Sequence, residues 1–462
     1  MRYGFVFALL FLLPATGMPA TYYVPGDFST IQGAIDGVSN GDTIIVRPGT
    51  YTSYFGGFTF RGKAVTLRSE QGPAVTIFDM RQQTTSVVFF KNGEGPGSVL
   101  DGFTITNGYD YHGGGILCDS SSPTIMNNII TGNTGYHGGG GIACENYSSP
   151  TIKGNIISGN TAAGFTGGGI ECSLFSSNPN IVNNTITGNT ATTYGGGISC
   201  SGSATITNNI LTGNTAAVNG GGIYIADSDI IIANNTISGN TASVEGGGIY
   251  NQNPFARTIV NNIVWDNSAP VGPEISGYYG ITEAIYCDVK GGWPGTGNID
   301  ADPLFLDPGD LDFHLLMPSP CRDAGDNSAV LDLYDFEGDV RITDGIADMG
   351  ADEFHHHLYY SGDLVPGGSG KIIAIAKYPN PCLLALSGLR NPPTPTPYGD
   401  LYLTLPLWKQ WPFAVTTDGT QVIPVVVPSG ASPGDQFYFQ ALIGPSGLWN
   451  SKLTNLMTLT VE

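Results

Sequence analysis

The stretch GGGILCDSSSPTIMNNIITGNT, residues 113–134, contains both halves of a repeat that fills the middle of the chain. The first half, three glycines and an isoleucine, recurs with its isoleucine at Ile116, Ile142, Ile170, Ile198, Ile223 and Ile249. Variants of the second half, Asn127–Thr134, follow, and the last is the degenerate Asn261–Ser268. Self-similarity with a period of about 26 residues is typical of solenoid proteins.

The repeat predicts strands, because apolar residues alternate with period 2 and show no helical period. A unit of this length suits one coil of a parallel β-helix, in which coils stack ~4.8 Å apart and equivalent residues form ladders. We expect asparagines to share amide hydrogen bonds along such a ladder, isoleucines to fill the core and glycines to form turns. Residues 43–315 then make about eleven coils, so the predicted fold is all-β.

A short helix is expected before the first coil. Ser29–Gln32 has the form of a capping box, and Ile31, Ala34, Ile35 and Val38 share one helical face. Such a helix would cover the open end of the solenoid, where unpaired strand edges otherwise favour association.

The composition limits the classes of partner. The 462 residues include 17 Lys and Arg against 38 Asp and Glu, a formal charge of −21. This acid excess argues against nucleic acid and anionic membrane surfaces as partners. Residues 1–20 combine Arg2, an apolar run and small residues through Ala20, which predicts a secretory signal peptide, with an uncleaved anchor as the alternative. We expect no membrane-spanning segment in the mature chain.

Four of the seven cysteines follow the repeat. Cys118, Cys144, Cys172 and Cys200 each lie two residues after a repeat isoleucine. In-register strands would hold their Cβ atoms ~4.8 Å apart, wider than the ~3.8 Å typical of a disulfide. We expect a buried thiol column that packs as small apolar groups, with metal binding as the alternative. Whether Cys287 and Cys321 pair stays open.

Several motifs resemble known families. Thr30–Asp36, Gly41–Ile44 and Pro48–Tyr51 resemble the opening of right-handed parallel β-helix proteins of the pectin-lyase-like superfamily. The repeats also resemble those of polymorphic outer-membrane proteins. Asn298–Phe305, Asp312–Leu315, Ser319–Gly325 and Asp348–Phe354 are similar to the choice-of-anchor Q domain of exported bacterial β-helix proteins. The resemblance implies a right-handed solenoid with an anchor-like end region.

These observations predict four parts. They are a signal peptide at 1–20, a capped β-helix at 21–290, a choice-of-anchor Q-like end region at 291–357 and a β-sandwich module at 358–462. The last part is predicted from short strands that alternate with Pro- and Gly-rich turns.

Two acids are candidates for catalysis. Asp119 and Glu145 each follow a cysteine of the column, and glycosidases need two carboxyl groups several ångströms apart. The alternative is chance placement on an acidic surface. Glu171 precedes its cysteine, and from strand alternation we expect it on the other face. Lys153 and Arg257 are the only basic residues between 107 and 270, whereas superfamily lyases use a Lys or Arg base.

Aromatic residues precede the glycine turns in four successive coils, and a stripe of this kind could stack on sugar rings. The candidates for carbohydrate binding are Tyr111, His112, Tyr136, His137, Phe165 and Tyr194. The alternative is an aromatic ladder that packs the turn.

A calcium site is predicted in the acidic end region. Asp332, Asp335, Glu337 and Asp339 alternate around a glycine, and calcium takes six to eight oxygen ligands. Turns that depend on Asp side chains are the alternative.

The leading functional hypothesis is a monomeric bacterial protein, secreted or at the cell surface, that acts in surface display, adhesion or carbohydrate binding without catalysis. Its partner would be a polysaccharide or a cell-surface component. The rival hypothesis is a polysaccharide lyase or glycoside hydrolase that acts from a groove along the β-helix.

Overall fold

The computed structural model describes part of the chain. The described residues are 18–53, 56–81, 83–173, 177–226, 230–253, 258–278, 283–316, 318–343, 345–354, 357–362, 369–375, 381–387, 390–396, 399–403, 409–414, 420–426, 436–443, 452–453 and 457–460. The predicted signal peptide therefore lies almost entirely outside them. Within the described residues no helix is long and apolar enough to cross a membrane.

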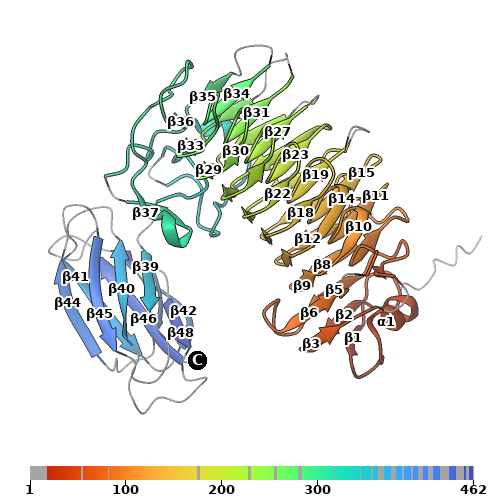
Figure 1. The fold of residues 1–462 in the computed structure, drawn as a ribbon. Helices are drawn as coiled ribbons and strands as arrows, with labels where there is room; N and C mark the ends of the chain where they lie inside the picture. The colour runs from red at the N-terminus through yellow and green to blue at the C-terminus, as the bar shows by residue number, and fades with distance from the viewer. Residues whose placement is uncertain are drawn as a thin grey trace, which may run out of the picture.

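The described residues from Thr21 to Val289 form a parallel β-solenoid of about ten turns (Figure 1). One sheet has 11 strands, in the order β1 (Thr21–Val24), β2 (Thr43–Val46), β5 (Thr66–Ser69), β8 (Val99–Asp101), β12 (Thr124–Met126), β16 (Thr151–Lys153), β20 (Asn180–Val182), β24 (Ala204–Thr207), β28 (Ile230–Ala233), β32 (Thr258–Val260) and β35 (Ala284–Ile285). A second has 10 strands, β3 (Gly49–Tyr51), β6 (Thr76–Asp79), β9 (Thr104–Thr106), β13 (Ile129–Thr131), β17 (Ile156–Ser158), β21 (Thr185–Thr187), β25 (Ile210–Thr212), β29 (Thr236–Ser238), β33 (Ile263–Trp265) and β36 (Asp288–Val289).

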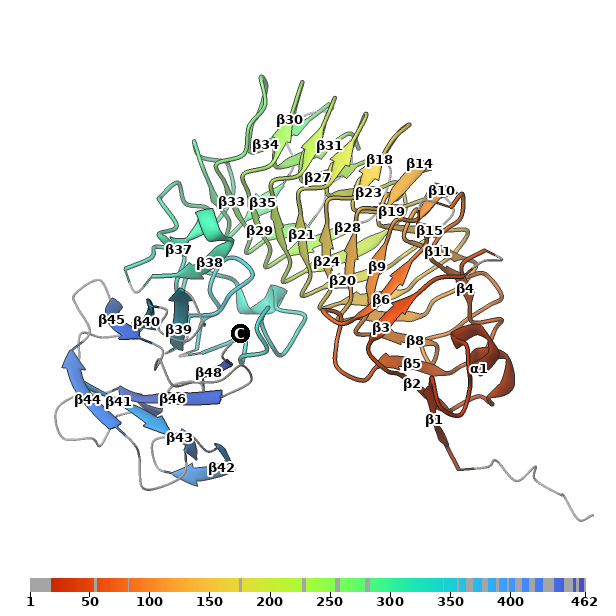
Figure 2. The ribbon, with the colours of Figure 1, turned by 60° about the horizontal axis from the view of Figure 1, so that its bottom comes forward.

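Two further sheets complete each coil. The 9-stranded sheet contains β4 (Phe58–Thr59), β7 (Val88–Phe90), β11 (Ile116–Asp119), β15 (Ile142–Glu145), β19 (Ile170–Cys172), β23 (Ile198–Cys200), β27 (Ile223–Ile225), β31 (Ile249–Asn251) and β34 (Ile275–Gly277). The 6-stranded sheet runs along one edge of the stack (Figure 2) and contains β10 (Tyr109–His112), β14 (Thr134–Gly138), β18 (Thr161–Ala162), β22 (Thr190–Ala191), β26 (Thr215–Ala216) and β30 (Thr241–Ala242). The solenoid prediction is confirmed, with about ten turns instead of eleven because the coils end near Val289 instead of residue 315.

Two asparagine ladders connect successive coils, as the repeat predicts. In the first ladder each amide nitrogen donates to the next amide oxygen at 3.0–3.1 Å, through Asn128, Asn155, Asn184, Asn209, Asn235 and Asn262. The second ladder runs at 2.9–3.0 Å through Asn133, Asn160, Asn189, Asn214, Asn240 and Asn267. The ladder side chains are buried, so these bonds satisfy turn amides that water cannot reach.

The two asparagines of each Asn-Asn pair have different tasks. The second joins the ladder, whereas the first, for example Asn127, Asn183 or Asn208, has a φ of 54–56°. Asparagine tolerates this left-handed conformation better than most residues, so it forms the corner between the 11- and 10-stranded sheets. The three glycines before each repeat isoleucine form another turn, which lies against the next coil. A Cβ on Gly115 of this turn would lie 2.6 Å from the carbonyl oxygen of Gly141.

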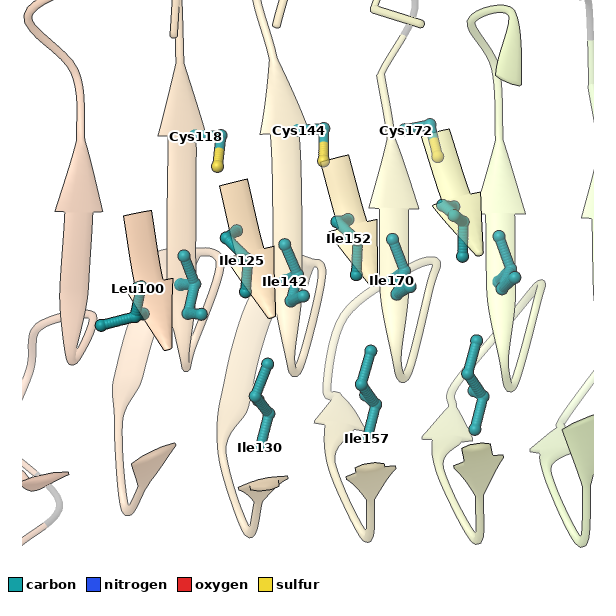
Figure 3. Close-up of a cluster of buried hydrophobic side chains, with 14 of the residues drawn as sticks. Leu100, Cys118, Ile125, Ile130, Ile142, Cys144, Ile152, Ile157, Ile170 and Cys172 are labelled. Atoms are coloured by element: carbon teal, nitrogen blue, oxygen red, sulfur yellow. The ribbon is translucent and has the colours of Figure 1, made fainter. Parts of the chain in front are cut away.

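The interior is a stack of isoleucines with the predicted thiol column beside it (Figure 3). Cys118, Cys144, Cys172 and Cys200 are in register on β11, β15, β19 and β23 and are fully buried. They are free thiols, as are Cys287 and Cys321, so the pair left open by the sequence is not made. The Cys321 sulfur instead lies 3.1 Å from the Asp288 carboxylate.

Helix α1 (Ile31–Gly37) lies beside β1 and β2 at the N-terminal end of the solenoid (Figure 1). The Thr30 hydroxyl accepts from the Gly33 amide, so Thr30 is the N-cap, and Ile31 and Ile35 are buried. The expected helix is confirmed. Its capping box is not formed, because the Gln32 side chain instead bonds the backbone of Thr59 on the next coil.

A segment that we call the flanking segment, residues 299–354, follows the last coil. It contains the antiparallel pair β37 (Phe305–Asp307) and β38 (Asp312–Leu315) and the short 3-10 helices Pro308–Asp310 and Asn327–Ala329. It returns along the solenoid, where the side-chain amides of Asn183 and Asn261 donate to the carbonyl oxygens of Asp335 and Asp326.

The last described strands are antiparallel. Three form the sheet β39 (His357–Gly362), β40 (Ser369–Ile375) and β45 (Thr420–Val426). Others are β44 (Lys409–Ala414), β41 (Pro381–Ser387), β46 (Gln436–Ile443), β47 (Lys452–Leu453) and β48 (Met457–Thr460), and the pair β42 (Arg390–Thr396) and β43 (Gly399–Leu403). They agree with the all-β prediction for this part, while the predicted domain boundaries stay predictions.

Candidate functional site: an aromatic and acidic surface on the solenoid

Five of the six predicted aromatic candidates meet over three coils. Tyr111 and His112 come from β10, Tyr136 and His137 from β14, and Phe165 from the turn after β18. The His137 ring lies 5.3 Å from Tyr111 and 4.8 Å from Phe165 between ring centroids. The Tyr111 and Tyr136 rings are 5.9 Å apart. We call these five residues the ring cluster.

The ring cluster faces solvent. Tyr111, Tyr136 and Phe165 are 53%, 51% and 49% exposed, although each is a large apolar group. Their position follows from the repeat, because these turns precede the three glycines in successive coils; the pairing of β10 with β14 shifts register between Asp110 and His112, at the rings themselves. Rings exposed on one surface can bury their faces against a ligand, and aromatic rings that pack a turn do not need such exposure.

Tyr194, the sixth candidate, belongs to another group of rings. It stacks on Tyr224 at 4.5 Å with an interplanar angle of 11°, and Tyr224 stacks on Tyr250 at 5.7 Å and 4°. Tyr224 and Tyr250 are each only 5% exposed. We call these three residues the tyrosine stack. The alternative of an aromatic ladder that packs the turn therefore applies to Tyr194. It applies less well to the five residues of the ring cluster.

Both predicted catalytic acids lie beside the ring cluster. Asp119 and Glu145 are directly opposite each other in the register of β11 and β15. Glu145 Oε1 lies 2.5 Å from His112 Nδ1, so the two side chains are in direct contact. Asp119 Oδ1 accepts from the side chains of Asn146 at 2.9 Å and Ser120 at 3.1 Å.

Glu171 lies on the same face, contrary to the expectation from the sequence. It pairs with Ala143 across β15 and β19, and the charge of Glu145 acts on its carboxyl group. The physical reason is simple: the residues before and after a core-facing cysteine both point away from the core. Because Glu171 directly precedes Cys172, it lies on the same face as Asp119 and Glu145. The Thr166 hydroxyl donates to it at 3.1 Å.

Burial raises the pKa of two of these acids, Glu145 and Glu171, toward neutrality. It raises the pKa of Glu145 to about 7, with a further increase from the charge of Asp119. Burial also raises the pKa of Glu171 to about 7, and the charge of Glu145 adds to the effect. Burial lowers the pKa of His112, against the opposing charges of Asp110 and Asp119. At neutral pH the surface therefore holds carboxyl groups that can donate as well as accept hydrogen bonds.

Neither basic residue between 107 and 270 is described at this surface, but Lys91 is close to it: it directly follows Phe90 of β7, which pairs with Cys118, and so continues the register toward Asp119. Lys153 lies on β16 of the 11-stranded sheet, away from β11, β15 and β19. Arg257 falls outside the described residues. The arrangement can stack on sugar rings, exchange hydrogen bonds with hydroxyl groups and offer a protonated carboxyl beside a second acid.

Asp110 is a further member of this surface that the sequence did not single out. Its carboxylate accepts from the Ser86 amide at 2.8 Å and from the Ser86 hydroxyl at 3.0 Å, which fixes the start of the turn. Its position directly before Tyr111 in the chain is the sequence feature that could have identified it as part of this surface. Glu171 could have been found by applying strand alternation correctly around Cys172.

The four predicted calcium ligands do not converge. Asp332 accepts from the Thr207 hydroxyl at 2.8 Å. Asp335 Oδ1 accepts from the amides of Glu337, Gly338 and Asp339 at 2.8–3.0 Å, which is the Asp-dependent turn that the sequence left open as an alternative. Glu337 points elsewhere, to His314.

Family comparisons agree with the solenoid. Residues 76–216 match the family described as the right handed beta helix region, and residues 167–298 match the family described as periplasmic copper-binding protein (NosD). None of the curated proteins compared matches the chain.

Two solved structures are similar to this chain. One is pectate lyase Pel9A, at 18% identity and a TM-score of 0.42, with 73% of this chain and 97% of that chain covered. Another is alginate lyase from Paenibacillus sp. str. FPU-7, at 15% identity and a TM-score of 0.33, with 61% of this chain and 98% of that chain covered.

Proposed function

We propose that this right-handed parallel β-helix protein is exported and binds a polysaccharide through the ring cluster. The observation that carries the proposal is the exposure of Tyr111, Tyr136 and Phe165, each about half exposed, on three consecutive coils. Coils repeat every ~4.8 Å, so the solenoid presents rings at regular steps, as an extended polymer would require. Export is supported by residues 1–20 and by the match to a family described as periplasmic.

The acids beside the rings favour a polymer that they can contact without repulsion. Glu145, with a pKa of about 7, is partly protonated at neutral pH and can donate to sugar hydroxyl groups, and Glu171, buried beneath the turn with a pKa of about 7, adds only part of a negative charge. A neutral polysaccharide therefore suits the surface better than a strongly acidic one, because the whole chain carries a net charge of −21.

Hydrolysis of the bound polymer is the second candidate function. It is favoured by one observation: Glu145, whose pKa burial raises to about 7, lies directly opposite Asp119 in the strand register. A protonated carboxyl group next to a second acid is the pair that glycoside hydrolysis requires. β-Elimination would have to use Lys91, which continues the register of β7 toward Asp119, since Lys153 lies on another sheet.

Affinity gel electrophoresis of the purified chain in gels containing xylan, glucomannan, alginate or polygalacturonate tests binding. We expect retardation by at least one neutral polymer. The double variant Tyr111→Ala/Tyr136→Ala should lose it, while the control Tyr278→Ala should keep it, because Tyr278 is 69% exposed on the turn after β34, several coils away. Equal mobility of all three proteins in every gel contradicts the proposal.

A reducing-sugar assay on the same polymers separates binding from hydrolysis. Product formation that disappears in Glu145→Gln, with retardation preserved, would establish the second candidate function. Retardation without product would leave binding as the function of the surface.

A further inference from the structure

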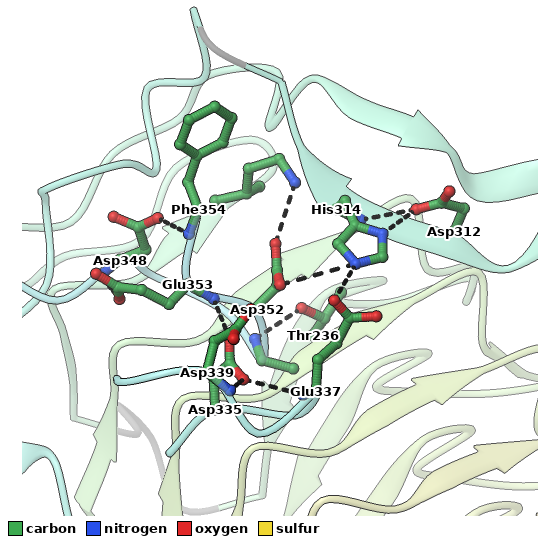
Figure 4. Close-up of polar contacts among 12 residues, drawn as sticks. Thr236, Asp312, His314, Asp335, Glu337, Asp339, Asp348, Asp352, Glu353 and Phe354 are labelled. Atoms are coloured by element: carbon green, nitrogen blue, oxygen red, sulfur yellow. Dashed lines mark hydrogen bonds and ion pairs between the residues drawn. The ribbon is translucent and has the colours of Figure 1, made fainter. Parts of the chain in front are cut away.

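Three potential ligand atoms meet in the flanking segment, far along the chain from the ring cluster. His314 on β38 places its Nε2 atom 2.9 Å from Glu337 Oε2 and 4.0 Å from Asp352 Oδ1 (Figure 4). All three ligand atoms lie within 4.8 Å of one another, although the residues come from three separate parts of the segment. A single ion could therefore contact all three without a change of backbone path.

The other nitrogen of His314 is also fixed. Its Nδ1 atom is in close contact with Asp312 Oδ1, two residues earlier on β38. Histidines that bind metals commonly donate the second ring N–H to a carboxylate, which orients the ring and sets the tautomer. The other oxygen of Asp352 accepts from the Leu315 amide at 3.4 Å, so this carboxylate is oriented as well.

The charges also favour a cation. Asp312, Glu337 and Asp352 surround one imidazole, and even a protonated ring leaves more negative than positive charge in a half-buried place. A bound ion would take the place of the Nε2 proton and supply two positive charges instead of one.

We propose that His314, Glu337 and Asp352 bind a divalent transition-metal ion, with Zn²⁺ as the best fit, and that Asp312 is the positioning residue. One imidazole and two carboxylates suit zinc, whereas calcium prefers six to eight oxygens. Of the four residues predicted to bind calcium, this site includes only Glu337. It lies beyond residue 298, where the NosD match ends, and shares no residue with the ring cluster.

Isothermal titration of the purified, EDTA-treated chain with ZnCl₂ tests the proposal. Wild type should bind Zn²⁺, and Glu337→Gln should lose about one equivalent, or bind it more than ~10-fold more weakly. Glu337 is exposed, so this variant should fold; circular dichroism checks it. Asp352→Asn is a second variant with the same expected loss. Asp339→Asn is the matched control, since it removes the same charge from the same turn but not from the set of three.

The positioning role has its own readout. Asp312→Asn should keep the stoichiometry and weaken Zn²⁺ binding by about 10-fold, and the visible bands of Co²⁺-loaded protein should shift. Zinc bound equally by wild type, Glu337→Gln and Asp352→Asn would place the metal elsewhere, for instance at the His355–His357 run, and overturn the proposal. Failure of wild type to bind zinc would identify His314 as a simple ion-pair partner and overturn it too.

Discussion

The two groups of rings lie along the same edge of the solenoid but differ in exposure. In the ring cluster, Tyr111 and Tyr136 each expose about half of their surface, whereas Tyr224 and Tyr250 of the tyrosine stack expose 5%. The rings of the tyrosine stack are nearly parallel, with interplanar angles of 4° and 11°, while those of the ring cluster meet at 28–71°.

One position in the 9-stranded sheet explains the difference. The residue after the repeat isoleucine forms a register column through Leu117, Ala143, Glu171, Ser199, Tyr224 and Tyr250. In later coils this position carries Tyr224 and Tyr250, whose rings stack on each other and are almost fully buried. Smaller or acidic residues occupy it beneath the ring cluster, so the rings there come from the turn and stand in solvent. The same repeat thus carries packed rings in one part of the solenoid and exposed rings in another, and the two parts differ in this column.

The largest expected effect is a loss of stability when a ring of the tyrosine stack is removed. Tyr224→Ala should destabilise the chain by about 3 to 5 kcal/mol, because it removes a buried ring between two others. Tyr136→Ala should change stability by less than about 0.5 kcal/mol, as expected for an exposed side chain. Urea unfolding followed by circular dichroism measures both, and similar losses in the two variants would remove the distinction between the groups.

The next effect concerns the acid in the shared column. Glu171 has a pKa of about 7 in the fold and 4.5 as its ordinary value, so only the folded state keeps the proton between these values. Stability should therefore fall as pH rises from 4.5 to 7 and stay lower above it. Glu171→Gln stays neutral and should be more stable than wild type by about 2 to 3 kcal/mol at pH 8.

Unfolding at pH 4 is the internal control for that variant. Wild type and Glu171→Gln should then be alike, because the carboxyl group is protonated in both states. A difference between the two proteins that does not vary with pH would show that Glu171 acts through packing and not through its charge.

A smaller effect, on polymer binding, is expected at the boundary between the ring cluster and the tyrosine stack. Phe165→Ala should weaken polymer binding by about five- to tenfold, the loss expected when one stacking ring, worth ~1 kcal/mol, is removed. Tyr194→Ala, one coil further on, should leave binding unchanged. Comparing their retardation in affinity gels decides the boundary, and an equal loss in both would extend the binding surface into the tyrosine stack.

The smallest effect concerns the pH dependence of binding. As pH rises from 5 to 8, Glu145 and Glu171 lose their protons, so an acidic polymer should bind a few-fold more weakly while a neutral polymer changes less. Gels run at several pH values and at constant ionic strength measure this. Parallel behaviour of neutral and acidic polymers would mean that these carboxyl groups do not face the ligand.

Periodicity made most of the solenoid predictable. The ladders through Asn128 and Asn133 and the column that begins at Cys118 follow from register alone, since equivalent residues must stack. The exposure of Tyr111 was not predictable in this way, because it depends on which side chain fills a neighbouring column. His314 was missed because its partners Glu337 and Asp352 are brought to it by the path of the flanking segment, which follows no repeat.

The flanking segment has a consequence for how this protein can change over evolutionary time. Solenoids gain and lose length by duplicating or deleting whole repeats. Between Asn183 and Asn261, side chains of successive coils hold fixed partners in residues 326–335, so an added coil there would displace those partners by ~4.8 Å. Coils before Asn183 make none of the bonds described here to that segment. An added coil in the N-terminal part of the solenoid, which carries the ring cluster, would therefore break none of these bonds, whereas one added between Asn183 and Asn261 would put them out of register.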